Sequence, residues 1–166
     1  MTNPLVISPS HPSPLAEPAE LRDVSVADGV AAFQAAAPQT TTVITSEEQL
    51  RAALTGATGR VLLDFVQKDC EACDAEGPLL DKLAGTCPGT TVLKVDVDDL
   101  PHIADALKAN DTPTLYLGTG KDFLSDLERG SKQLEDGKNV SRPKHIKEVL
   151  DPEDPKLLRK LKCVRK

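Results

Sequence analysis

The chain has 166 residues, 39% of them hydrophobic, with a formal net charge of -6 and an isoelectric point of about 5.1. This length supports one compact core with some chain left over, and the acidic balance argues against nucleic acid as the main partner, because phosphate binding needs a concentrated excess of Lys and Arg. We find no long apolar run, no basic start followed by an apolar stretch and no Arg-rich leader, so we expect neither membrane insertion nor export, and predict a cytoplasmic location.

The first 40 residues are rich in proline and alanine and poor in large apolar side chains. Such a segment buries too little apolar surface to offset the entropy lost on folding, so we predict a largely disordered tail over 1–40, with a short helix at 26–36 as the alternative. We assign the folded domain to 41–151 and a C-terminal extension to 152–166.

From residue 41 the sequence alternates between short apolar runs and amphipathic segments. The pattern predicts, in chain order, a strand at 42–44, a helix from Ser46 to Leu54, a strand at 61–66, a helix from Cys70 to about Leu83, a strand at 91–97, a helix from Pro101 to Lys108 and a strand at 114–117. Strands that alternate with helices in this way indicate an α/β fold.

The last part of the domain carries weaker signals. Gly130 and Gly137 punctuate residues 119–142. We predict an edge strand near 123–127, with a helical turn as the alternative. Pro143 suits the first turn of a helix, so we predict a closing helix over 143–150.

The C-terminal extension combines an apolar stripe with a basic face. Leu157, Leu158, Leu161 and Val164 recur at helical spacing among six Lys and Arg residues. We expect this helix to pack on its own domain; the alternative is docking to an acidic partner or an anionic membrane surface.

Two cysteines mark the point where a buried strand turns into a helix. Cys70 and Cys73 follow the predicted strand at 61–66, and the N–H groups at a helix N-terminus stabilise a thiolate. Cys70 is therefore the candidate nucleophile, and Cys73 is the candidate thiol that resolves a mixed disulfide.

The alternatives for this pair are two inert structural thiols or half of a zinc site. A tetrahedral zinc site needs two further ligands, and the sequence offers only four scattered candidates: Cys87, Cys163, His102 and His145. We predict that Cys87 is a packed side chain without a redox role. Cys163 is a candidate for a dimer or regulatory disulfide.

Asp64 is a carboxylate inside an otherwise apolar strand. Burial of a carboxylate costs free energy unless it is paired or protonated. We hypothesise that Asp64 takes the proton from Cys73, with Lys94 modulating its charge; the alternative is a strand-end carboxylate already in solvent.

Three acids, Asp69, Glu71 and Asp74, surround the cysteine pair. Their charges oppose a thiolate, so we expect a reducing rather than an oxidising protein and clients with basic surroundings. The alternative is that solvent and salt screen these charges.

Over about 41–151 the chain resembles the thioredoxin family. Asp64 lies six residues before Cys70, Pro78 lies five after Cys73, Lys94 is in the next strand, and Thr112-Pro113-Thr114 opens the following one; thioredoxins carry matching residues in the same order.

The resemblance implies a three-layer α/β/α fold with a central mixed sheet, a cis bond before Pro113 and dithiol–disulfide exchange. It also implies that Thr112 and Pro113, together with Glu71 and Ala72, receive an extended client segment. No prosthetic group is expected beyond the redox-active disulfide of Cys70 and Cys73.

Two features depart from the family's usual pattern. Thioredoxins usually read Trp-Cys-Gly-Pro-Cys-Lys, whereas this chain reads Asp-Cys-Glu-Ala-Cys-Asp at 69–74 and contains no tryptophan, and its stretch at 130–143 is longer, as for a surface insertion.

We expect a monomeric enzyme that reduces disulfides in client proteins and is recharged by a reductase or another dithiol. The alternatives are a thioredoxin-fold adaptor whose cysteine pair is regulatory or vestigial, and a glutathione-dependent, glutaredoxin-like enzyme.

Overall fold

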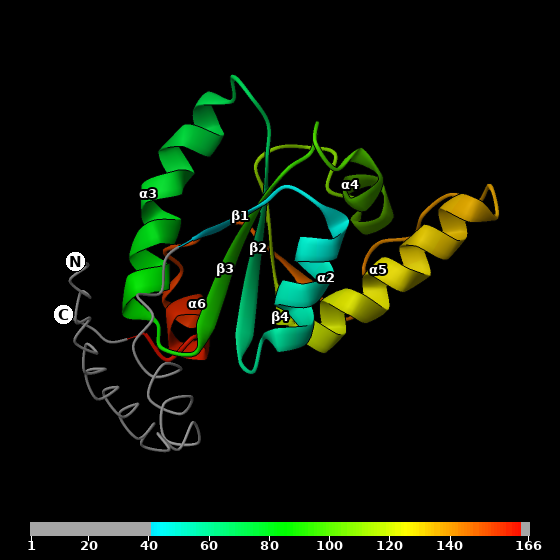
Figure 1. Cartoon of the computed structure of the whole chain (residues 1–166). Helices are drawn as coiled ribbons and strands as arrows, with labels where there is room; N and C mark the ends of the chain where they lie inside the picture. Colours follow the sequence, from blue (N-terminus) through cyan, green and yellow to red (C-terminus); the bar gives the residue numbers. More distant parts are fainter. Residues whose placement is uncertain (1–40, 164–166) are drawn as a thin grey trace, which may run out of the picture. The chain divides into compact units, whose positions relative to one another are not determined.

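The computed structural model describes residues 41–163 (Figure 1). The tail and short helix predicted within 1–40 lie outside the described residues, as does Val164. The elements in chain order are β1 (Thr42–Ile44), α2 (Glu47–Gly56), β2 (Arg60–Val66), α3 (Glu71–Thr86), β3 (Thr90–Asp96), α4 (Pro101–Leu107), β4 (Thr114–Thr119), α5 (Gly120–Glu135), β5 (Lys147–Val149) and α6 (Pro155–Lys160).

The strands form one five-stranded sheet in the order β1-β3-β2-β4-β5. Strands β1 and β2 each pair with β3 in parallel, whereas β4 pairs with β2 and with β5 in antiparallel fashion. Helices α3 and α6 cover one face of this sheet, and α2, α4 and α5 cover the other (Figure 1). The predicted three-layer α/β/α fold with a mixed sheet is confirmed.

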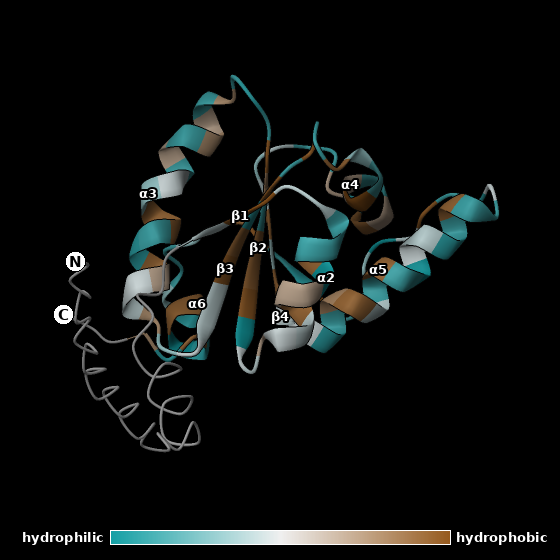
Figure 2. Cartoon of the chain, viewed as in Figure 1, coloured by the Kyte–Doolittle hydropathy of each residue, from teal (hydrophilic) through white to brown (hydrophobic). Residues whose placement is uncertain are grey.

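The central strand β2 contributes to both halves of the core. Val61, Leu63 and Phe65 pack with α2, α4 and α5, while Leu62 packs with α3 and α6. A strand buried on both faces reads as a continuous apolar run, and Figure 2 shows this hydrophobic run along β2 and alternating polar and apolar residues along α3 and α5. Asp64 interrupts the run on the face that α3 covers.

The edge strand predicted near 123–127 is wrong, because these residues lie in helix α5. The helix begins with a capping box, in which Thr119 Oγ1 accepts from the Asp122 N–H and Asp122 Oδ2 accepts from the Thr119 N–H. A Cβ atom at Gly120 would overlap the Leu54 carbonyl oxygen, and one at Gly130 would overlap that of Ala106. These glycines therefore allow α5 to pack closely on α2 and α4.

The closing helix predicted over 143–150 is also wrong. Residues 143–146 have no helical structure, and β5 follows them and pairs with β4. The buried Asp126 carboxylate accepts N–H hydrogen bonds from Lys144, His145 and Ile146 at 3.0, 2.8 and 3.0 Å. These three bonds occupy backbone donors ahead of β5 and fix its approach to the sheet.

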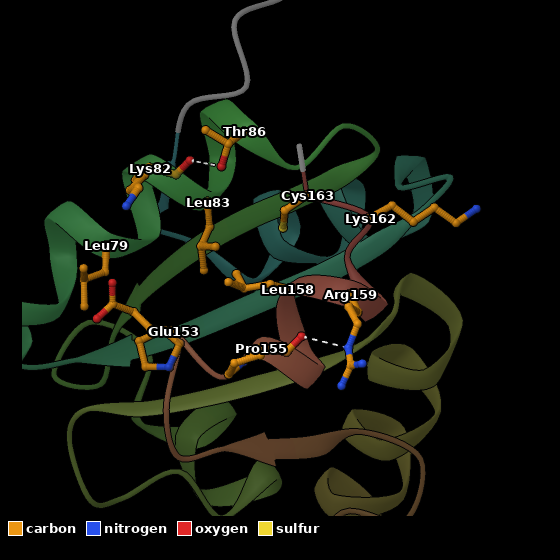
Figure 3. A pocket seen from close by; sticks show the side chains of 11 residues that line it. Leu79, Lys82, Leu83, Thr86, Glu153, Pro155, Leu158, Arg159, Lys162 and Cys163 are labelled. Carbon is orange, nitrogen blue, oxygen red and sulfur yellow. Dashed lines mark hydrogen bonds between the residues drawn. The ribbon is translucent and has the colours of Figure 1, made fainter. Parts of the chain in front are cut away.

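Helix α6 packs on α3 through Leu157 and Leu161, which are buried with Leu80 and Leu83. An open groove remains between the two helices; Figure 3 shows Leu83 and Leu158 in it, with Lys82 and Lys162 pointing outward. In residues 41–163 no helix has the length and apolar character needed to cross a membrane.

A disulfide bond joins Cys87 to Cys163. Cys87 is fully buried, as predicted, but the prediction that it is only a packed thiol is wrong, because it is bonded. Cys87 is also the C-cap of α3, so the bond joins the end of that helix to the residues after α6.

Candidate active site

The turn between β2 and α3 places Cys70 at the N-cap of α3, directly before its first residue. Asp69 has φ 57°, in the left-handed region that aspartate tolerates better than most residues. Cys70 then adopts an extended conformation and caps α3: its Sγ atom accepts a hydrogen bond from the Cys73 N–H at 3.1 Å. The sulfur atom thus lies among the free N–H groups of the helix, where a thiolate is stabilised.

Cys70 and Cys73 are joined by a disulfide, with their Cα atoms 5.2 Å apart. Cys70 is partly exposed, whereas Cys73, inside the first turn, is only 4% exposed. Of the two sulfur atoms, that of Cys70 is therefore the more accessible.

Asp64 is completely buried in β2, so the alternative of a strand-end carboxylate in solvent is wrong. Within the described part of the chain, neither carboxyl oxygen has a hydrogen-bond donor. Burial and the nearby charge of Glu76 raise the pKa of Asp64 to about 7, while Lys94 opposes the rise. This carboxyl group therefore changes its charge near neutral pH.

Lys94 lies beside Asp64 because their Cα atoms are register partners in the β2–β3 pairing. The ammonium extends to α3, where Nζ is 3.6 Å from the position that a Cβ at Gly77 would take. A glycine there leaves room for the lysine under the helix.

Glu76 is a site residue that the sequence reasoning missed. It lies three residues after Cys73 on α3 and is half-buried. Burial raises the pKa of Glu76 above its ordinary value, and Lys94 counteracts this. Its helical spacing from Cys73 was the available signal, because residues three apart share a helix face.

An open groove runs beside the cysteine pair. The Thr112–Pro113 bond is cis, as the resemblance implied, and Pro113 lines this groove together with Ala72 and Glu76 of α3 and Glu148 of β5. Of the predicted client-binding residues, the structure thus brings Ala72 and Pro113 together. Thr112 is half-buried beside Pro113, and Glu71 is exposed outside the groove lining.

The candidate zinc ligands are not brought together. The four cysteines form two separate disulfides, His102 Nε2 lies 3.1 Å from a Glu47 oxygen, and His145 Nδ1 lies 3.1 Å from Asp126 Oδ1. Over residues 41–163, no three His, Cys, Asp or Glu side chains converge.

The thioredoxin family model matches residues 41–138. The chain belongs to the thioredoxin family. It is 34% identical over 92 residues to a thioredoxin of Chlamydia trachomatis, a match that covers 55% of this chain and 74% of the relative. It is 36% identical over 78 residues to an H-type thioredoxin of Ricinus communis, covering 46% and 64%.

Solved thioredoxin structures share the fold. A thioredoxin of Nicotiana alata superposes with a TM-score of 0.53 at 16% identity, over 76% of this chain and 93% of that one. A variant thioredoxin of Halobacterium salinarum gives 0.51 at 23% identity, over 76% and 90%. Membership of this family supports thiol–disulfide oxidoreductase chemistry in general.

Proposed function

We propose that this thioredoxin-family protein reduces disulfides in client proteins through Cys70 and Cys73. The observation that carries the proposal is the position of the pair: an accessible sulfur caps α3, and a second, buried sulfur lies within bonding distance of it. Exchange requires both an exposed thiolate and a resolving thiol.

The first step forms a mixed disulfide. The Cys70 thiolate attacks one sulfur of the client disulfide, and the client S–S bond breaks. The other client sulfur leaves as a thiolate and takes a proton from solvent. One Cys70–client disulfide has formed.

The second step releases the client. The Cys73 thiol gives its proton to the Asp64 carboxylate and attacks Cys70 Sγ, so the bond between Cys70 and the client breaks. The second client sulfur leaves as a thiolate, and the Cys70–Cys73 disulfide forms. Two electrons have passed to the client, and an external reductase or dithiol must restore the pair.

Client recognition uses the groove beside Pro113. An extended client segment lies along Thr112 and Pro113, with Ala72 on the other side of the groove and Glu71 exposed just outside it. Asp69, Glu71 and Asp74 are all exposed around the pair, so their negative charge favours clients with basic residues near the disulfide. The same charge opposes a thiolate and makes the protein a reductant rather than an oxidant.

We propose further that the protein works as a monomer in the cytoplasm and needs no prosthetic group. Structural disulfides seldom persist in that compartment. The redox state of Cys87 and Cys163 in cells, measured by thiol trapping, is therefore the direct test of the location; a stably oxidised pair would contradict it.

The experiment is insulin reduction driven by dithiothreitol, comparing the native chain with Cys70→Ser and Cys73→Ser. We expect both variants to lose the activity and Cys73→Ser to accumulate mixed disulfides. Activity that survives Cys70→Ser would contradict the proposal and favour an adaptor whose cysteine pair is not catalytic.

A further inference from the structure

Asp64 is sealed from solvent on all sides. The residue is 0% exposed, and no group of residues 41–163 donates a hydrogen bond to either of its oxygens. The oxidised protein holds on Asp64 the proton that came from Cys73, so this carboxyl group needs a path along which it exchanges protons with water.

Two charged side chains act on Asp64, and they come from two of the three elements packed against it; the third, β4, has the apolar Leu115 as the register partner of Asp64. Lys94 lies beside it on β3, and Glu76 lies above it on α3; both influence its pKa. An ammonium has only donors and cannot accept the proton. Glu76 is a carboxylate and can accept it.

Glu76 also reaches solvent. It is half-buried, and it lines the open groove that contains Ala72 and Pro113. Glu148 of β5 is a further charged group on this groove and is itself exposed. One end of the path is therefore the buried carboxyl group, and the other is the groove that clients occupy.

We propose that Glu76 is the proton relay between Asp64 and the groove beside Pro113. Because Asp64 and Glu76 share no hydrogen bond, the proton taken from Cys73 passes from Asp64 to the Glu76 carboxylate through a bridging water. Glu76 then releases it to water in the groove, and the reverse transfer protonates Asp64. No electron moves in this step. Above pH 7, starting from the Cys70 thiolate and an ionised Asp64, one proton, that of Cys73, leaves the protein for each pair of cysteines oxidised. The inference rests on the proposed function.

The proton affinities of the two carboxylates support such a transfer. Burial raises the pKa of both groups, that of Asp64 to about 7, and Lys94 lowers both. A raised pKa lets each carboxyl group hold a proton at a pH where an exposed carboxylate would be fully ionised, which a relay requires.

The test follows protons and sulfur chemistry at the same time. Protein in which the Cys70–Cys73 pair is reduced and the Cys87–Cys163 disulfide is kept is mixed with a nitrobenzoate disulfide. This reagent releases one coloured thiolate when Cys70 attacks and a second when Cys73 resolves. This leaving group stays ionised, so the proton of Cys73 must go to solvent. A pH-indicator dye in weakly buffered solution records its arrival.

In the native chain we expect the proton to appear together with the second coloured thiolate. In Glu76→Gln we expect the proton to appear about tenfold or more slowly than the second thiolate of the same variant, whatever the rate of that thiolate. Small amounts of imidazole should abolish the lag, and Glu76→Asp, which keeps a carboxylate, should show none. Asp81→Asn removes an exposed acid from the same helix and should behave as the native chain.

If the proton and the second thiolate appear together in Glu76→Gln, the relay is wrong. A shift in the pH profile of thiolate release would not rescue it, because a purely electrostatic effect of Glu76 on Asp64 would shift that profile without delaying the proton. A native chain that releases a single coloured thiolate would instead overturn the proposed function, and the relay with it.

Discussion

Asp64 and Lys94 are register partners across the β2–β3 pairing, yet the carboxyl oxygens of Asp64 accept no hydrogen bond from the lysine. The positive charge is close enough to oppose the rise in the pKa of Asp64, but burial and Glu76 outweigh it and bring that pKa to about 7. A tight ion pair would have kept the carboxylate ionised. The present arrangement lets it take up and release a proton near neutral pH.

The first prediction concerns the pH dependence of client release. A base must be ionised to accept the Cys73 proton, so we expect the resolving rate to rise with pH through an inflection near 7. Asp64→Asn should remove this inflection and slow resolution at pH 7.5 by about tenfold to a hundredfold. The measurement is stopped-flow release of the second thiolate, and an unchanged profile in Asp64→Asn would exclude Asp64 as the base.

The second prediction concerns stability. The folded pKa of Asp64 lies above its unfolded value, so its contribution to stability is fully present below pH 4 and is lost as pH rises through 7. We expect Asp64→Asn to be more stable than the native chain at pH 8, by up to about 4 kcal/mol, and the gain to shrink toward pH 4. Urea unfolding at several pH values measures the difference in free energy of unfolding between Asp64→Asn and the native chain. A difference that does not vary with pH would contradict the raised pKa of Asp64.

The third prediction concerns the Cys87–Cys163 disulfide, which spans 76 residues. Removing a cross-link over a loop of this length lowers the free energy of unfolding by about 4 kcal/mol in the chain-entropy description. We expect Cys163→Ser to show this loss under oxidising conditions and to match the native chain once dithiothreitol has reduced both. Cys70 and Cys87 lie at opposite ends of α3, about 24 Å apart along its axis, so Cys163→Ser should leave the rate of insulin reduction unchanged. A lower rate would show that the disulfide at one end of α3 affects the cysteine pair at the other.

The fourth prediction concerns the connection to β5. Burial favours a higher pKa for Asp126, but hydrogen bonds from the Ile146, Lys144 and His145 N–H groups outweigh it and lower the pKa to about 2. The stabilising effect of the Asp126 carboxylate is present above pH 4 and is lost as pH falls toward 2. We therefore expect Asp126→Asn to lower the free energy of unfolding by about 2 kcal/mol at pH 7, and that free energy to fall less steeply in acid than in the native chain. The control is Glu128→Gln, an exposed acid on the same helix; equal losses in both variants would argue against a specific role for Asp126.

The elements from β1 to β4 can be predicted from the sequence, because the spacing of their apolar residues and the residues at their boundaries indicate the same structure. Apolar runs marked the buried strands, Ser46 supplied an N-cap and Pro101 a first helical turn. The cysteine pair was located correctly for the same reason, since it follows a strand that could be recognised.

The region after β4 contains two signals whose meaning depends on their surroundings. Gly130 predicts a break, but it lies inside α5, where its lack of a side chain permits contact with α4. Thr119 and Asp122 form a capping box that the sequence already contained. Helix α5 was therefore predictable, although its packing was not.

Other features depend on contacts between distant residues. Pro143 is an acceptable first residue of a helix. A helix does not form there because the N–H groups of residues 144–146 donate to the Asp126 carboxylate. Pairing of Cys87 with Cys163 follows from the packing of α6 on α3, which no local pattern encodes. Glu76 becomes informative only once α3 is known to lie over Asp64 and Lys94.

The most direct test of the central claim is to identify the sulfur that captures a client. The Cys73→Ser variant should be mixed with a disulfide-containing peptide, and the trapped complex digested without reduction and mapped by mass spectrometry. We predict a single linkage from Cys70 to the peptide, while the native chain releases the peptide as free thiols. A linkage through Cys87 or Cys163, or no linkage from a variant whose native parent reduces the peptide, would contradict the account.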